Sequence, residues 1–223
     1  LVYKSVDALI KAELALPAGE RIDAVAIVTP NALHYPFAKK LLSNGFHLIC
    51  EKPMTLTVKE ALDLEKLVAK NKLTFALTHT YTGYPMVRQM RDLIAKGVLG
   101  TIQRIDAQYY QGWINAIIYG TGSRITGVWR LDPKHAGVSS CMGDIGVHAF
   151  NLIEYTTGLE VKEVLADLNN VKDGVKLDLD GTVLIRFNKK LKGVIRASQV
   201  CAGLENDIII AVYGSKGSLR WHQ

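Results

Sequence analysis

Residues 24–29 read AVAIVT, and they are followed directly by PNALH at residues 30–34. A short, continuous apolar run of this kind is typical of a strand that a parallel sheet buries on both faces. Apolar residues then recur at helical spacing as far as Leu42, and Asn44-Gly45 supplies a helix stop signal. These features predict a strand followed by a helix.

The same unit repeats further along the chain. FHLIC at 46–50 and LTFALT at 73–78 predict two more buried strands, and between them a T-x-x-E capping box at Thr57 opens a helix. Alternating strands and helices are the pattern of a doubly wound α/β domain. We therefore expect residues 1–80 to form a partial Rossmann-like domain.

From residue 81 the pattern changes to long strands rich in Tyr, Val, Ile and Thr. Candidate strands lie near 101–113, 161–171, 181–188, 191–201, 207–213 and 217–221, with helices near 86–96 and 144–155. Short polar turns between neighbouring strands predict antiparallel hairpins. We expect residues 81–223 to form an α+β domain with a large, mostly antiparallel sheet. The absence of an initiator Met and the abrupt ends lead us to expect truncation in both domains.

Charge and cysteine content narrow the class of protein. Lys and Arg total 27 against 21 Asp and Glu, but the only adjacent basic pairs are Lys39-Lys40 and Lys189-Lys190. Dispersed charge argues against a nucleic-acid partner and suits a phosphate-bearing cofactor. No run approaches the roughly 18 apolar residues of a membrane span. The three widely separated cysteines favour a reducing compartment, so we expect a cytoplasmic protein.

Two candidate sites follow predicted strands. Thr29, Pro30, Asn31 and His34 stand where the first strand gives way to a helix. Ligands of open α/β sheets bind beyond the carboxyl ends of the strands, although Asn31 could equally be a helix N-cap.

Glu51 and Lys52, followed by Pro53, come directly after the second strand, at the same predicted edge. A Lys held there can exchange a proton with a reacting oxygen. The alternative is a solvated surface Lys.

The third candidate is Asp144 with His148. Four residues apart on a helix, they share one face, where an imidazole can take a hydroxyl proton and a carboxylate can orient it. The alternatives are a helix-capping Asp and a buried structural His. One Asp and one His are too few ligands for a metal, so we expect none.

The fourth candidate is Trp129 with Arg130, an aromatic plane beside a guanidinium that could recognise phosphate or hydroxyl groups. Both residue types are also common in ordinary packing and surfaces.

In this order, TPNxxH, EKP, WRxDP and GDxGxH resemble the glucose/fructose oxidoreductase and inositol dehydrogenase family, Gfo/Idh/MocA, over essentially the whole chain. The resemblance implies that residues 1–80 belong to a Rossmann domain that binds NAD or NADP, followed by a domain with a large, mostly antiparallel, open sheet. It implies that Lys52 is the catalytic lysine and that Asp144 and His148 act on the substrate hydroxyl. The remaining implied positions, close to the cofactor, are Thr29, Pro30, Asn31, His34, Glu51, Trp129 and Arg130.

The reaction expected from this resemblance is hydride transfer between a hydroxyl carbon of a sugar, polyol or cyclitol and nicotinamide. Tyr109, Tyr110 and Trp113 are expected to line the sugar pocket. Two alternatives stay open: a glycosidase that uses a tightly held NAD, and a non-catalytic sugar or dinucleotide sensor. The resemblance also implies a homodimer or homotetramer.

Two departures from the family pattern limit these expectations. The glycine-rich phosphate loop is absent, as is the residue that distinguishes NAD from NADP, so the sequence does not encode a preference between them. Residues 81–85, YTGYP, and 138–141, VSSC, stand where many members have Arg-Phe-x-Pro and paired glycines. These departures bear on substrate identity more than on the reaction.

Overall fold

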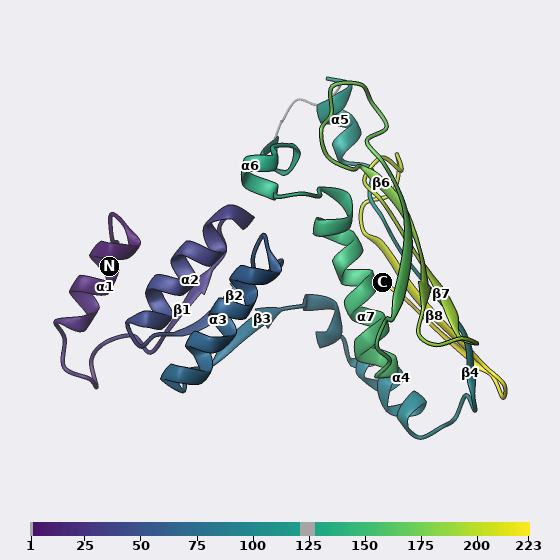
Figure 1. The fold of residues 1–223 in the computed structure, drawn as a ribbon, viewed down its shortest axis with the longest axis horizontal. Coiled ribbons are helices and arrows are strands. Elements are labelled where there is room, and N and C mark those ends of the chain that lie inside the picture. Colours follow the sequence, from purple (N-terminus) through teal and green to yellow (C-terminus); the bar gives the residue numbers. More distant parts are fainter. Residues whose placement is uncertain (1, 121–127) are drawn as a thin grey trace. The chain divides into compact units, whose positions relative to one another are not determined.

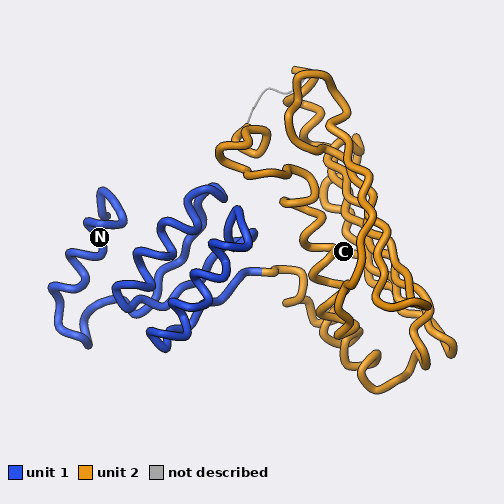
Figure 2. Tube along the Cα trace, in the orientation of Figure 1, with its two compact units in different colours: residues 1–78 blue, residues 79–223 orange. Residues whose placement is uncertain are grey.

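The computed structural model describes residues 2–120 and 128–223. The chain divides into two compact units, Leu1–Thr78 and His79–Gln223 (Figure 2). The boundary expected from the sequence fell after residue 80.

The first unit is a three-stranded parallel sheet with helices, as expected for part of a Rossmann-like fold. The strands pair in the order β1-β2-β3, with Ala26 opposite Ile49 and Ile49 opposite Ala76. The elements are α1 (Val6–Leu14), β1 (Ala24–Ile27), η1 (Asn31–Leu33), α2 (His34–Ser43), β2 (His47–Glu51), α3 (Val58–Asn71) and β3 (Phe75–Thr78). Thr57 caps α3, and the predicted capping box with Glu60 is formed.

The apolar runs of this unit predicted strands covered on both faces, and in the described residues one face of β2 is buried within the unit. Leu48 and Cys50 of β2 are fully buried, while Ile49 between them is 47% exposed. Alternate residues of a strand face opposite sides of the sheet, so burial here is one-sided. The first strand is also shorter than predicted, because it ends at Ile27 and Val28 is 76% exposed.

The second unit is a six-stranded sheet with helices, in the order β5-β6-β7-β4-β8-β9. Only the β4–β7 pair is parallel among the pairs described, so the sheet is mostly antiparallel, as predicted. The helical elements are η2 (Thr80–Gly83), α4 (Pro85–Ala95), α5 (Ile114–Ile118), η3 (Val128–Leu131), α6 (Pro133–Ala136), η4 (Met142–Gly146) and α7 (Val147–Thr157). The strands are β4 (Ile102–Tyr110), β5 (Glu163–Asn169), β6 (Asp180–Arg186), β7 (Lys192–Ser198), β8 (Asp207–Gly214) and β9 (Ser218–His222).

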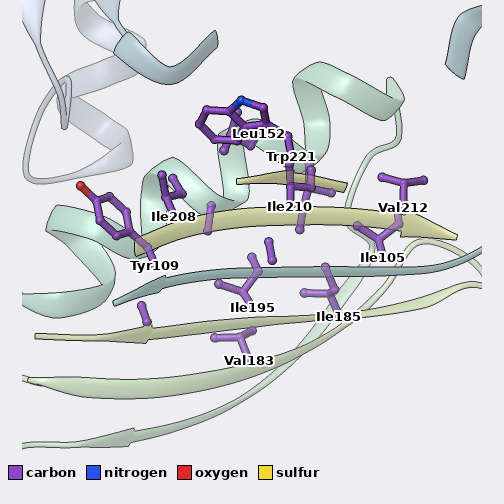
Figure 3. Close-up of a cluster of buried hydrophobic side chains, with 14 of the residues drawn as sticks. Ile105, Tyr109, Leu152, Val183, Ile185, Ile195, Ile208, Ile210, Val212 and Trp221 are labelled. Carbon is purple, nitrogen blue, oxygen red and sulfur yellow. The ribbon is translucent and has the colours of Figure 1, made fainter. Parts of the chain in front are cut away.

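The core of this unit lies between the sheet and the helices α4 and α7 (Figure 1). Inward side chains of neighbouring strands, among them Ile105, Ile195 and Ile210, are at most 2% exposed. They form one cluster with Leu152 of α7 and with Trp221 (Figure 3). The sheet and α7 therefore form two layers that pack against each other.

The helix predicted at 144–155 begins earlier and in a different form. A π-helical turn, η4, runs from Met142 to Gly146, and α7 continues from Val147 to Thr157. Asp144 is therefore inside the helical segment, and the interpretation of Asp144 as its N-cap was wrong, since Cys141 occupies that position. Within residues 2–120 and 128–223, none of the helices has both the length and the apolar character that a bilayer crossing requires.

Candidate active site

In the first unit, His34 connects the two strand-end segments that the sequence singled out. It is the first residue of α2 and is fully buried. Its Nδ1 lies 2.7 Å from the carbonyl oxygen of Pro53, and its Nε2 lies 2.8 Å from the carbonyl oxygen of Thr29. The imidazole thus joins the segment after β1 to the segment after β2.

The other predicted residues of this unit stand at the same strand ends. Thr29 and Pro30 follow β1, Asn31 begins η1, and Glu51 ends β2 immediately before Lys52. Neither η1 nor α2 has a side-chain cap hydrogen bond, so the alternative reading of Asn31 as a capping residue was wrong.

In the second unit, four of the predicted residues line one cavity of about 450 Å³. They are Trp129, Arg130, Asp144 and His148, and the remaining walls come from Tyr109, Gln111, Trp113 and Ile145. Residues from β4, η3, η4 and α7 therefore converge on one concave surface.

A charged pair lies inside this cavity. Arg130 Nε is 3.1 Å from Asp144 Oδ2, an ion pair whose angle does not make a hydrogen bond. The guanidinium stacks over Trp129 at 4.4 Å and lies 5.8 Å from the ring centroid of Trp113. Aromatic faces and the carboxylate together hold the cation in place.

His148 lies among aromatic rings on the same side of the cavity. It is 9% exposed, and its ring meets Tyr81 edge-on at 4.8 Å and Tyr109 at 6.1 Å. The hydroxyls of Tyr81 and Tyr109 are hydrogen-bonded to each other, and Tyr109 also donates to Asn206 Oδ1 at 2.8 Å. Burial raises the pKa of both phenols above the usual value, so they are neutral hydrogen-bonding groups near neutral pH.

An amide and an indole also line the cavity. Trp113 Nε1 donates to Gln111 Oε1 at 2.9 Å, and Gln111 Nε2 donates to Asn206 Oδ1 at 2.7 Å. Tyr109 and Trp113 line the cavity as expected, but Tyr110 does not. Tyr110 follows Tyr109 on the same strand, so its side chain faces the other side of the sheet.

Two sequence models of one family match the chain, one on each unit. The model described as "GFO/IDH/MocA C-terminal domain" matches residues 87–220, which is more than half of the chain. The model described as "Oxidoreductase family, NAD-binding Rossmann fold" matches residues 2–79.

The chain belongs to the Gfo/Idh/MocA oxidoreductase family.

Curated relatives and solved structures agree with this membership. The uncharacterized oxidoreductase YfiI of Bacillus subtilis (strain 168) is 32% identical over 204 residues, 90% of this chain and 51% of the relative. The levoglucosan dehydrogenase of Pseudarthrobacter phenanthrenivorans is 27% identical over 220 residues, 89% of this chain and 55% of the relative. An inositol dehydrogenase homolog of Azotobacter vinelandii, crystallised with NAD+, is 31% identical with a TM-score of 0.91, covering 99% of this chain and 56% of that one.

This Gfo/Idh/MocA chain thus spans about half the length of the curated relatives it matches. Its N-terminal match is to the NAD-binding Rossmann fold, so the cofactor is a nicotinamide dinucleotide, NAD or NADP.

The residues present fit such a cofactor at one point that the structure makes specific. Thr29 Oγ1 is buried and has no hydrogen-bond partner among the described residues. An unsatisfied buried hydroxyl is uncommon, and here it lies just beyond the carboxyl end of β1, where dinucleotides bind in Rossmann folds. No group of three or more His, Cys, Asp or Glu side chains in residues 2–120 and 128–223 is arranged to hold a metal ion.

One residue that supports the site, Asp178, was not identified from the sequence. Asp178 is 9% exposed and accepts from the backbone N–H of Ser140 at 2.9 Å, from that of Met142 at 2.7 Å and from the Ser139 hydroxyl at 3.1 Å. Its carboxylate therefore holds the start of η4, which carries Asp144. The only local signal is the Ser139-Ser140 pair before the helix, and nothing near Asp178 in the sequence points to it.

Proposed function

We propose that this chain is part of an NAD- or NADP-dependent oxidoreductase that transfers a hydride between a hydroxyl carbon of a sugar, polyol or cyclitol and nicotinamide. The observation that carries the proposal is the cavity of the second unit. There Asp144, His148 and Arg130 meet beside Trp113 and Gln111. An aromatic face with amide, carboxylate and guanidinium groups is suited to a ligand rich in hydroxyls.

The names of two relatives support the substrate class. One is a levoglucosan dehydrogenase, and one solved structure is an inositol dehydrogenase homolog. Both names refer to small polyhydroxylated rings. We extend that class to this chain, without choosing one compound.

Eight residues are proposed to hold the cofactor. We assign to this role Thr29, Pro30, Asn31, His34, Glu51, Lys52, Trp129 and Arg130. His34 acts through the two carbonyl groups that its ring holds, because it is itself fully buried. When bound, the nicotinamide ring supplies the position that accepts or donates the hydride.

Three side chains have roles in the reaction at the substrate hydroxyl. His148 takes the proton of the reacting hydroxyl during oxidation and returns it during reduction. Lys52 polarises the reacting oxygen and stabilises the negative charge that develops on it. Asp144 orients His148 or binds a neighbouring hydroxyl. Tyr81 and Tyr109 cover His148 with aromatic surface and limit its access to water.

The test is a spectrophotometric assay of the purified protein, following NAD and NADP reduction against a panel of sugars, polyols and cyclitols. Lys52→Met and His148→Ala are the matched variants, and we expect each to lower kcat by about 100-fold or more, given the 10²–10⁴-fold typical of general acid–base groups. Turnover that survives both substitutions would contradict the assigned roles. Tight dinucleotide binding without reduction of any compound would favour the redox-cycling glycosidase or the sensor instead.

We also propose that the protein forms a homo-oligomer through the open face of the second sheet. Leu165, Leu184 and Val194 pair across β5, β6 and β7 on that face, and Leu165 and Leu184 are 70% and 53% exposed. An exposed apolar row on a sheet usually meets a partner. Sedimentation of the purified protein should give a dimer or tetramer, and Leu184→Lys should shift it towards monomer.

We propose a cytoplasmic location because the cysteines are not paired in disulfides. Cys50, Cys141 and Cys201 are all free thiols, and burial raises the pKa of Cys50 to about 12. Unpaired, unreactive thiols are typical of proteins from reducing compartments. Fractionation of the source cells with immunodetection would test the location.

A further inference from the structure

We propose that Gln199 is a positioning residue that fixes the direction of the Asp144 carboxylate, and that Ser140 in turn fixes the amide of Gln199. The catalytic consequence of this inference rests on the proposed function. The hydrogen-bond geometry from which it is argued does not.

Gln199 follows β7 directly and is fully buried. Its side-chain Nε2 donates to Asp144 Oδ2 at 3.1 Å, and its Oε1 accepts from the Ser140 hydroxyl at 3.2 Å. Its backbone N–H donates to the Leu179 carbonyl at 2.8 Å, which holds the residue in place at its base. Ser140 is 1% exposed, so this chain of contacts is shielded from water.

The orientation of the amide follows from elementary donor and acceptor rules. A carboxylate only accepts, so the NH₂ end of Gln199 must face Asp144. The oxygen end then faces Ser140, whose hydroxyl can donate to it. Reversing the amide would place its oxygen against a carboxylate oxygen of Asp144, which are two acceptors. The pair Ser140–Gln199 therefore presents a fixed donor to one oxygen of Asp144.

The same carboxylate oxygen also faces Arg130 Nε at 3.1 Å. A neutral donor from β7 and a cation from η3 thus approach Asp144 Oδ2 together, and rotation of the carboxylate would weaken both interactions. A carboxylate that is already held in its reactive orientation does not have to reorient during the reaction. Polar residues that hold it there therefore contribute to the rate.

Several titratable groups surround Asp144 and have to be considered in any pH measurement. Arg130 and His148 share its cavity. Tyr81, Tyr109 and Cys141 are close enough that its charge helps to raise their pKa values, although burial is the main cause for all three. Gln199 is uncharged and hydrogen-bonds to Asp144, so a negative charge placed at 199 would act directly on the Asp144 carboxylate.

The experiment replaces Gln199 by a side chain of almost the same shape. Gln199→Glu removes the donor and places a second carboxylate 3.1 Å from Asp144 Oδ2. Gln108→Glu is the matched control, because Gln108 also donates to an aspartate, Asp207, at 2.8 Å on the same sheet but does not line the cavity. We expect Gln199→Glu to lower kcat by about 10- to 100-fold, as charged hydrogen bonds of this kind imply. KM should change much less, and Gln108→Glu should resemble the wild type.

A second readout does not need activity. Carbon-13 NMR of labelled aspartate follows the titration of the Asp144 carboxyl group directly. In Gln199→Glu we expect its midpoint, and the acid limb of the kcat profile, to move to higher pH, because two neighbouring carboxylates resist joint ionisation. If the wild-type protein reduces no cofactor, the proposed function fails, while this titration still decides the role of Gln199.

A folded Gln199→Glu protein with wild-type kcat and an unchanged Asp144 titration would overturn the inference. If that variant does not fold, Ser140→Ala and Ser140→Thr carry the test. Ser140→Ala removes the hydroxyl that fixes the amide and should lower kcat about 2- to 10-fold, and Ser140→Thr, which keeps the hydroxyl, should restore it. Equal kcat values in these two variants would contradict the role of Ser140 and with it the fixed amide.

Discussion

The Nδ1 atom of His34 lies 2.7 Å from the carbonyl oxygen of Pro53, and the opposite ring nitrogen lies 2.8 Å from the carbonyl oxygen of Thr29. The ring therefore spans the two segments that follow β1 and β2, and Lys52 belongs to the second of them. Because His34 is fully buried, its side chain supports the loops that present neighbouring residues.

His34→Ala should destabilise the first unit and weaken dinucleotide binding together. Removing the ring takes the hydrogen-bonding partner from part-buried carbonyl oxygens, which costs about 1–3 kcal/mol of unfolding free energy per unsatisfied group. Urea unfolding and titration with NAD would measure the two effects. His47→Ala is the control, since the His47 ring accepts a bond at an exposed position from the backbone of Thr74. Equal losses in both variants would argue that the connection between strand ends has no special role.

Asp178→Ala should strongly destabilise the second unit. It leaves the Ser140 and Met142 N–H groups and the Ser139 hydroxyl without their acceptor in a buried site. We expect a loss of about 2–5 kcal/mol, measured by urea denaturation.

A matched comparison for Asp178 is Asp132→Ala. Asp132 also caps a helix, accepting from the Lys134 N–H at 2.9 Å, but at an exposed position. There the expected loss is about 0.5–1 kcal/mol. The hypothesis that Asp178 holds the start of η4 would be abandoned if the two variants lost similar stability.

Gly112→Ala should distort the wall formed by Gln111 and Trp113. A Cβ atom at Gly112 would lie 2.5 Å from the backbone oxygen of Cys201, closer than side chains pack. We expect a loss of about 1–3 kcal/mol and a raised KM for the sugar. Gly217→Ala, where a Cβ would meet nothing within 4 Å, is the control. A Gly112→Ala protein with unchanged KM would show that this wall does not bind substrate.

Glu13 should make the stability of the first unit depend on pH. The Tyr3 hydroxyl and the Ile22 N–H both donate to its carboxylate, and they hold the pKa of Glu13 below its usual value. A carboxyl group whose pKa is lower in the folded than in the unfolded state stabilises the fold at pH values above the unfolded-state pKa. This stabilisation is lost as the pH falls through the folded-state pKa.

Glu13→Gln should therefore be less stable than the wild type at pH 7, and the difference should shrink below about pH 4. Urea midpoints at pH 7 and pH 3 measure it, with the exposed Glu20→Gln as control. A difference that stays constant between the two pH values would exclude a contribution from the ionised carboxylate.

Much of the fold could be predicted because its signals are local. The apolar runs ending at Thr29, Cys50 and Thr78 predicted three parallel strands, and the turns at 188–190 and 214–217 predicted the β6–β7 and β8–β9 hairpins. Chain order alone places Lys52 directly after a strand. The spacing of Asp144 and His148 predicted that they share one helix face, and in the structure both line one cavity.

The remaining features depended on contacts between distant segments. Ile49 and Leu48 look equivalent in the sequence, whereas in the structure Leu48 belongs to the core of the first unit and Ile49 does not. The ion pair of Arg130 with Asp144 and the bond from Gln199 to Asp144 join segments from three parts of the chain. Helical and strand periodicity reports which face of an element is apolar, whereas the partner of a buried polar group is set by how the elements pack. Sequence alone therefore determined the fold class and the family, and it proposed the candidate site residues. The tertiary structure decided which contacts hold those residues in place, because such contacts join segments that are distant in the chain.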